Sequence, residues 1–349
     1  MFIYNEFMKK KILILGFGGT IAMVPDKSGV LRPAKSIDEI LKIVPSLAEM
    51  ANVTVKQLVN LDSTNLNPKH WVMLIDEICA QLEKYDGILV THGTDTMAYT
   101  SCAVSLALGR GLKKPIVFTG SQLPLVDQGT DARFNLENSI KVIVEAIKEN
   151  IAEVMVVFSD YILRANRTIK TSESKFIAFD SPVFPHLGSI TAVGVSFNSL
   201  ALKADKSIKL KVDKNFSEGI LAIELYPGIQ PEMIMPSLES GLCKALLLKS
   251  LGAGNVPSEG PYSLLPLIKH ATKKLNIPVL VSTKFTGGKV HMDIYEPGKL
   301  ALNAGAISTG DLTDVAAQVK CMWALKTWSK SKDKFKKIME SNIVGEISS

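Results

Sequence analysis

The chain has few cysteines and no long apolar run. Its four cysteines are scattered over 349 residues, and no two of them form a CxxC pair. This spacing argues against a disulfide framework and a cysteine zinc site, and it is typical of small buried side chains in a reducing cytoplasm. No uncharged apolar run approaches the roughly 18–20 residues that cross a bilayer, so we expect no membrane association.

The N-terminal segment is a poor match to a secretory signal. The apolar run at residues 12–15 is shorter than a signal peptide requires, and no small-residue cleavage site follows it. We therefore expect a cytoplasmic protein. The run instead has the character of a buried strand.

Charge of either sign is not concentrated in blocks. The 40 basic and 34 acidic residues give a net charge of +6, and no Lys/Arg block has aromatic residues interleaved with it. We therefore expect no nucleic-acid partner. Hydrophobic residues make up 46% of the chain and charged residues 21%, which argues against extensive disorder.

Continuous apolar stretches alternate with segments of helical periodicity along the whole chain. This alternation predicts an α/β protein with parallel sheets covered on both faces. A Lys- and Ser-rich stretch at residues 198–218 interrupts it. We therefore predict an N-terminal domain at residues 1–197, a linker at 198–218 and a C-terminal domain at 219–349.

Four polar clusters fall on or near the ends of predicted strands. Ligands bind beyond the carboxyl ends of strands in open parallel sheets, so these clusters are the candidate site. Glycines let backbone N–H groups approach a ligand, and hydroxyls act as donors or nucleophiles. The clusters are GFGGT (16–20), DSTN (62–65), THGTDT (91–96) and TGSQ (119–122).

Three other kinds of site fit less well. GFGGT lacks the spacing of a dinucleotide loop, and no GxxxxGK[ST] phosphate loop occurs. The five histidines are dispersed, and His92 beside Asp95 is too small a set for a metal, so no metal and no cofactor are expected. The G-x-S-x-G of a serine hydrolase is absent.

A threonine nucleophile fits the clusters better. Thr20 and Thr94 each follow a predicted strand, so both hydroxyls could face one crevice. A threonine hydroxyl needs a positioned base, which Lys170 could supply while Asp95 orients it. The alternative is that the threonine caps a helix and the lysine is a solvated surface residue.

At these residues the sequence resembles the bacterial-type L-asparaginase family, especially its cytoplasmic type I branch. GGTIA (18–22) and THGTDTM (91–97) resemble the two family signatures, and TGSQLP, NRTIK, GAGN and GDLT are further matches. The resemblance implies a larger N-terminal flavodoxin-like sheet and a smaller C-terminal Rossmann-like parallel sheet. It also implies a homodimer or homotetramer whose active sites lie between subunits.

The resemblance implies hydrolysis of L-asparagine to L-aspartate and ammonia through an acyl-enzyme. Thr20 matches the nucleophile, and Thr94, Asp95 and Lys170 match a second catalytic set. Ser63 and Thr64 match residues that hold the substrate's α-carboxylate, and Asp95 also matches a contact to its α-amino group. The full set of expected substrate-binding residues is Asp62, Ser63, Thr64, Gly93, Ser121 and Asn255.

One position departs from the family pattern. Val30 stands where the family carries a tyrosine on the mobile loop after GGTIA, so Lys27, Ser28 or Lys170 would have to activate Thr20. This leaves open a weakly active homologue that binds amino acids. A further alternative is the amidase subunit of a tRNA-dependent amidotransferase. That subunit has an extra N-terminal domain, whereas here GGTIA begins at residue 18, so asparagine hydrolysis is the preferred expectation.

Overall fold

The computed structural model describes residues 9–19, 21, 23–25, 28–29, 31–33 and 37–348. The chain divides into two compact units. One takes in Met1–Ser181 and Pro185–Val212, and the other takes in Pro182–Phe184 and Asp213–Ser349. The division after Val212 falls within residues 198–218, where the structure has neither helix nor strand. The end points 197 and 219 remain predictions.

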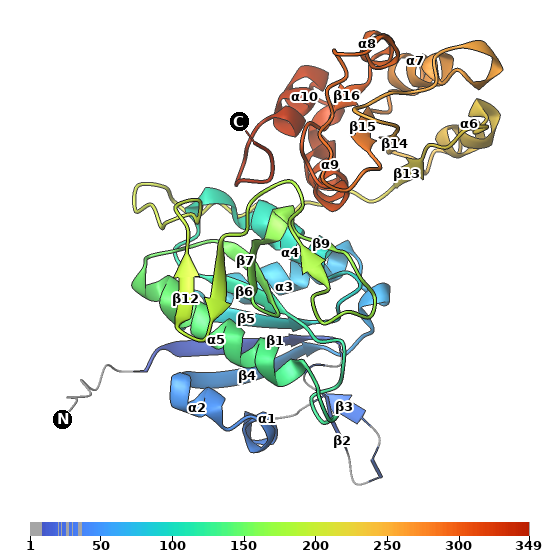
Figure 1. The fold of residues 1–349 in the computed structure, drawn as a ribbon. Coiled ribbons are helices and arrows are strands. Elements are labelled where there is room, and N and C mark those ends of the chain that lie inside the picture. Colours follow the sequence, from blue (N-terminus) through green and yellow to red (C-terminus); the bar gives the residue numbers. More distant parts are fainter. Residues whose placement is uncertain are drawn as a thin grey trace. The chain divides into compact units, whose positions relative to one another are not determined.

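A large mixed sheet forms the centre of the N-terminal unit (Figure 1). In the described part of the chain it has eight strands in the order β12-β11-β8-β7-β6-β5-β1-β4. Five neighbouring strands are parallel, and β8, β11 and β12 run antiparallel at one side. The strands are β1 (Lys11–Phe17), β4 (Asn52–Val59), β5 (Gly87–His92), β6 (Ile116–Thr119), β7 (Val154–Phe158), β8 (Tyr161–Arg164), β11 (Gly188–Thr191) and β12 (Gly194–Phe197).

The parallel part of the sheet has the flavodoxin-like order. Numbered along the chain, its five strands lie in the order 2-1-3-4-5, with β1 between β4 and β5. The chain leaves β1 toward one side and returns on the other, so a topological switch point lies between β1 and β5. Ligands bind at such points, beyond the carboxyl ends of the strands. Topology alone therefore directs attention to the residues after Phe17 and His92.

Helices cover both faces of this sheet. α3 and α4 pack on one another, and α5 packs against β5, β6 and β7 on the other face, beside α2 (Figure 1). The crossovers through α4 and α5 step in the same direction, yet their helices lie on opposite faces, so one of them departs from the usual right-handed rule. The helices are α1 (Ile37–Ile43), α2 (Ser46–Met50), α3 (Pro68–Gln81), α4 (Met97–Leu108) and α5 (Ala132–Lys148), with short 3-10 turns η1 (Ser63–Asn65), η2 (Gly109–Gly111) and η3 (Ala165–Arg167).

Two small antiparallel ribbons complete this unit. β2 (Met23–Pro25) pairs with β3 (Leu31–Pro33), and the connection between them contains Gly29 at φ +85°. β9 (Ile169–Lys170) pairs with β10 (Phe179–Asp180). Lys170 is therefore held in the second ribbon, where it pairs with Phe179.

The C-terminal unit holds a smaller parallel sheet in the order β13-β14-β15-β16, as far as the described residues go. Thr313 caps the long helix α9 (Asp314–Trp328) by accepting from the Ala316 N–H. The prediction of two α/β domains, the larger one N-terminal, is confirmed. The elements are β13 (Ile220–Glu224), β14 (Ala245–Ser250), β15 (Val279–Thr283), β16 (Ile307–Ser308), η4 (Gly260–Tyr262), α6 (Pro231–Glu239), α7 (Leu265–Lys273), α8 (Glu296–Ala304), α9 (Asp314–Trp328) and α10 (Lys332–Glu340).

Of the helices that the structure describes, none combines the length and the apolar character of a membrane span.

Candidate active site

Two glycine-containing strand ends meet at the switch point. Phe17 at the end of β1 pairs with His92 at the end of β5. Gly18 and Gly19 follow at φ +82° and +80°, a region that side-chain-bearing residues rarely adopt. A Cβ on Gly19 would lie only 2.5 Å from the Gly93 nitrogen. The two backbones therefore touch, and Thr20, the next residue, lies outside the described residues.

The buried ring of His92 holds the start of the THGTDT segment in place from the core side. Its ring is fully buried between Phe17 and Phe118, with centroids 5.5 and 6.3 Å away. Nδ1 lies 2.7 Å from the Gly93 carbonyl, which can only accept, so Nδ1 carries the proton. Nε2 then accepts from the Thr100 hydroxyl at 2.8 Å. Burial lowers the pKa of His92 to about 4, so the ring is neutral near pH 7 and has no free nitrogen to act as a base.

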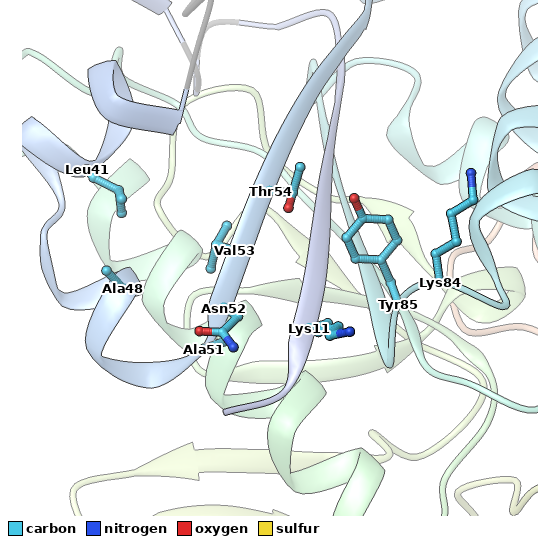
Figure 2. Close-up of a pocket in the computed structure, with 9 residues that line it drawn as sticks. All are labelled: Lys11, Leu41, Ala48, Ala51, Asn52, Val53, Thr54, Lys84 and Tyr85. Carbon is cyan, nitrogen blue, oxygen red and sulfur yellow. The ribbon is translucent and has the colours of Figure 1, made fainter. Parts of the chain in front are cut away.

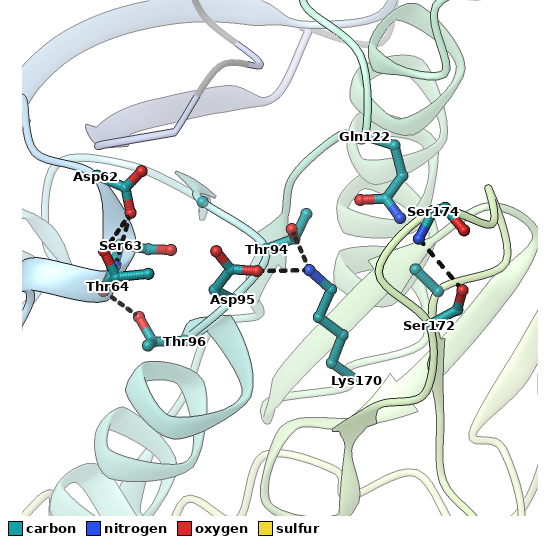
Figure 3. A network of polar contacts seen from close by, with 12 residues as sticks. Asp62, Ser63, Thr64, Thr94, Asp95, Thr96, Gln122, Lys170, Ser172 and Ser174 are labelled. Atoms are coloured by element: carbon teal, nitrogen blue, oxygen red, sulfur yellow. Dashed lines mark hydrogen bonds and ion pairs between the residues drawn. The ribbon is translucent and has the colours of Figure 1, made fainter.

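Thr94, Asp95 and Lys170 form one polar group (Figure 3). Lys170 Nζ donates to Thr94 Oγ1 at 2.8 Å and to Asp95 Oδ1 at 2.7 Å. The lysine side chain is 18% exposed and the aspartate side chain 55%. An amine in hydrogen-bond contact with a hydroxyl can take part in proton transfer to or from that hydroxyl, and the neighbouring carboxylate can orient the amine.

The DSTN cluster lies beside this group. Asp62 Oδ1 accepts from both the backbone N–H and the hydroxyl of Thr64, and these bonds lower the pKa of Asp62. Thr96 donates to the Ser63 carbonyl at 2.7 Å and so ties η1 to the start of α4. A Cβ on Gly93 would meet Ser63 Oγ at 2.7 Å, so only glycine allows this approach.

The TGSQ loop lies next to Thr94. A Cβ on Gly120 would lie 3.3 Å from the Thr94 methyl carbon. Ser121 donates its hydroxyl to the Leu123 carbonyl, so in this structure the hydroxyl proton is engaged within the loop. The loop is held by Asp131, which accepts from the Gln122 and Leu123 N–H groups, and by Asn135, which donates to the Gly120 carbonyl.

Several expected residues lie outside the described part of the N-terminal unit. Asn255 lies in the C-terminal unit, on a turn in which its N–H donates to the Leu251 carbonyl at 2.8 Å. Thr20, Lys27 and Val30 lie outside the described residues, so the question of the missing tyrosine stays with the sequence.

Other supporting residues were not expected to matter. Asn135, Asn166 and Ser105 are buried and hold the segments that carry the candidate residues. The NRTIK motif that contains Asn166 was visible in the sequence, but the partners of these side chains were not.

No metal site competes with this interpretation in the part of the chain that is described. It contains no group of three histidine, cysteine or carboxylate side chains placed to hold an ion. The four cysteines are free thiols.

A separate pocket of about 550 Å³ lies at the amino ends of β1 and β4 (Figure 2). Its polar lining includes Lys11, Asn52, Thr54, Lys84 and Tyr85. Because β1, β4 and β5 are parallel, this pocket is at the end of the sheet opposite to the candidate site. It contains none of the expected residues.

Comparison with known proteins identifies the family. Residues 11–202 match the family "Asparaginase, N-terminal", and residues 220–339 match "Glutaminase/Asparaginase C-terminal domain". An L-asparaginase of Thermococcus kodakarensis is 33% identical, covering 97% of this chain and 99% of that protein. A solved structure of a thermostable L-asparaginase from Thermococcus kodakarensis is 32% identical, covers 97% of this chain and 99% of its own, and has a TM-score of 0.89.

Two further relatives have names that point to different activities. L-asparaginase I of Vibrio cholerae has a solved structure that is 32% identical, covers 98% of this chain and 100% of its own, and has a TM-score of 0.85. A glutamyl-tRNA(Gln) amidotransferase subunit of Aeropyrum pernix is 31% identical over 97% of this chain and 80% of its own length. Since the two family matches together span most of the chain, and type I enzymes share its whole fold, the chain belongs to the asparaginase family of amidohydrolases and to its type I branch.

Proposed function

We propose that the protein hydrolyses L-asparagine to L-aspartate and ammonia. The observation that carries this proposal is the contact of Lys170 Nζ with both Thr94 Oγ1 and Asp95 Oδ1. This group lies at the switch point, where the backbones of Gly19 and Gly93 meet. Thr20 follows Gly19 directly in the sequence, and the proposal assigns its hydroxyl to the same site.

The proposed reaction has two halves. Thr20 Oγ attacks the side-chain amide carbon, the C–N bond breaks, and ammonia leaves with the proton that the hydroxyl gives up. Water then attacks the acyl group on Thr20 and releases aspartate. Thr94 and Lys170 position or activate the attacking group, and Lys170 can accept a proton only while its amine is uncharged.

Substrate recognition is assigned to groups around this crevice. The α-carboxylate is assigned to the donors of Ser63 and Thr64, and the Thr64 hydroxyl, which donates to Asp62 in this structure, would turn to the substrate. The α-ammonium suits the carboxylate of Asp95. Asp62 keeps Thr64 in place, since it accepts both of the threonine's hydrogen bonds. Gly93 and Ser121 are assigned to the same substrate-binding site. Asn255 is assigned to the site of a neighbouring subunit.

The assembly and compartment follow from the same assignment. We infer a homodimer or homotetramer, because Asn255 would then complete a neighbour's site. Four free thiols agree with a cytoplasmic protein. Cofactors, metals and nucleic acid have no part in the proposed chemistry.

Ammonia release tests the proposal directly. Purified protein with L-asparagine should give ammonia and aspartate in equal amounts, and Thr20→Ala should remove this activity. Thr191→Ala, an exposed threonine at the end of β11, is the matched control and should leave the rate unchanged. Equal ammonia release from wild type and Thr20→Ala would overturn the site. Binding of asparagine without turnover would favour the amino-acid-binding homologue.

The second candidate is the amidase subunit of a tRNA-dependent amidotransferase. The similarity to the amidotransferase subunit of Aeropyrum pernix, over 97% of this chain, is the observation that supports it. It predicts little activity on free asparagine. Hydrolysis that occurs only with a partner subunit and charged tRNA would decide for this candidate.

A further inference from the structure

The lysine of the candidate site is carried by a segment that is anchored at a distance. η3 is fully buried and packs against α4. Asn166, which is 1% exposed, donates its side-chain N–H to Ser105 Oγ at 3.0 Å inside this interface. Ser105 lies near the C-terminal end of α4, and the same helix begins just after Thr94 and Asp95.

The segment 166–170 is thereby attached to both ends of helix α4. From Asn166 the chain needs four residues to reach Lys170, whose Nζ contacts Thr94 just before the start of α4. The far end of the helix is joined to Asn166 and the near end to Lys170. A helix rises about 1.5 Å per residue and does not stretch, so the distance between the two attachment points is fixed.

The three residues between them, 167–169, have little freedom of their own. Thr168 donates its hydroxyl to the Arg164 carbonyl at 2.8 Å, which closes the turn at η3. Lys170 itself pairs with Phe179 in the β9–β10 ribbon. A shift of η3 along α4 would therefore be passed on to Lys170 rather than absorbed.

We propose that Asn166, acting through Ser105, is a positioning residue that sets the distance between Lys170 Nζ and Thr94 Oγ1. The pair does not touch the reacting atoms, and its effect on turnover rests on the proposed function of Lys170. Its effect on the distance from Lys170 Nζ to Thr94 Oγ1 is independent of that function. The groups assigned to substrate binding are held without η3, because the DSTN cluster is tied to α4 through Thr96 and Asp95 lies directly before that helix. Substrate binding should therefore be spared.

The variants Asn166→Ala, Ser105→Ala and the double variant test the pair. Misplacement by about 1 Å can cost roughly 100-fold in rate, so we expect kcat to fall at least ~10-fold while KM stays within ~2-fold. Because both residues act through one bond, the double variant should lose no more than the worse single variant.

The matched control is Ser101→Ala. Ser101 is equally buried on the same helix, one turn earlier, and donates to the Ala98 carbonyl of its own helix. It shares any general cost of removing a buried hydroxyl but does not contact η3 in the bonds described. Equal kcat values for Ser105→Ala and Ser101→Ala, or a loss confined to KM, would overturn the proposal.

Crystal structures separate this inference from the proposed function. In Ser105→Ala and Asn166→Ala, the distance from Lys170 Nζ to Thr94 Oγ1 should exceed 3.5 Å, whereas Ser101→Ala should keep the 2.8 Å contact. If wild type fails to hydrolyse asparagine but these distances change as expected, the proposed function is wrong and the positioning role stands. An unchanged distance in both variants would remove the positioning role, whatever the activity.

Discussion

Gly19 and Gly93 pack backbone against backbone where β1 and β5 end. A Cβ on Gly19 would meet the Gly93 nitrogen at 2.5 Å and its Cα at 2.6 Å, distances that a real side chain never has. The contact brings the two glycine motifs of the sequence to one point of the sheet. It also leaves no room for a side chain between the segments that lead to Thr20 and Thr94.

Substituting Gly19 by alanine should therefore separate the two strand ends. We expect the loss of most asparagine hydrolysis and a destabilisation of about 1–3 kcal/mol from overpacking, in addition to the cost of a positive φ. Gly129→Ala is the matched control, because Gly129 has φ +73° but nothing within 4 Å of its Cβ position. Thermal unfolding and ammonia release measure both effects. Equal losses in the two variants would mean that backbone strain, and not the contact, is responsible.

Lys170 should be required as a base and not only as a positive charge. Lys170→Met removes the amine, and Lys170→Arg keeps the charge but cannot give up its proton near neutral pH. General acid–base catalysis contributes roughly 10²–10⁴-fold, so both variants should lose kcat by that order. Lys141→Met, at an exposed position on α5, is the control. Activity of Lys170→Arg close to wild type would assign Lys170 a purely electrostatic role.

Strand ends were predictable because their signals are local. A continuous apolar run followed by glycine and hydroxyl residues locates THGTDT without reference to the rest of the chain. The same holds for Asn67 and Pro68, which cap and begin α3 as their types predict. From these ends we expected Lys170 to reach Thr94, and the two lie 2.8 Å apart, although their catalytic roles stay predictions.

The missed features depend on pairs of residues that are distant in sequence. Asn166 and Ser105 are 61 positions apart, and a single buried amide leaves no periodic pattern. The antiparallel strands β8, β11 and β12 have four residues each, too few to show a clear alternation, so the sequence suggested a purely parallel sheet. The face on which α5 packs is a property of the crossover and not of the helix sequence.

His92 should make stability depend on pH between about 4 and 6.5. Its folded pKa is lowered to about 4 by burial, so in this window the unfolded chain binds a proton that the folded protein does not. Stability should therefore fall as the pH drops from 6.5 to 4, by at most about 3 kcal/mol for this group. Chemical unfolding of wild type and His92→Gln at several pH values measures the difference. NMR titration of the ring provides the direct check, and an ordinary histidine pKa would contradict the assignment.

Lys320 and Glu346 form a buried ion pair in the C-terminal unit. Both side chains are 0% exposed, with Nζ and Oε1 2.7 Å apart. Glu346 also accepts from the Ile343 and Val344 N–H groups, and Lys320 donates to the Met339 and Ser341 carbonyls. The pair thereby fixes the segment after α10.

Removing one partner of this pair should destabilise the C-terminal unit more than removing both. Glu346→Ala leaves a buried ammonium without its carboxylate, which typically costs about 3–5 kcal/mol. Lys320→Met combined with Glu346→Leu should recover much of this loss, because the buried charges are gone. Glu340→Ala, at the exposed Lys336–Glu340 pair, is the control and should change stability by about 0–1 kcal/mol. Calorimetric unfolding distinguishes the three variants, and a double variant no more stable than Glu346→Ala would show that the hydrogen bonds, and not the unpaired charge, carry the effect.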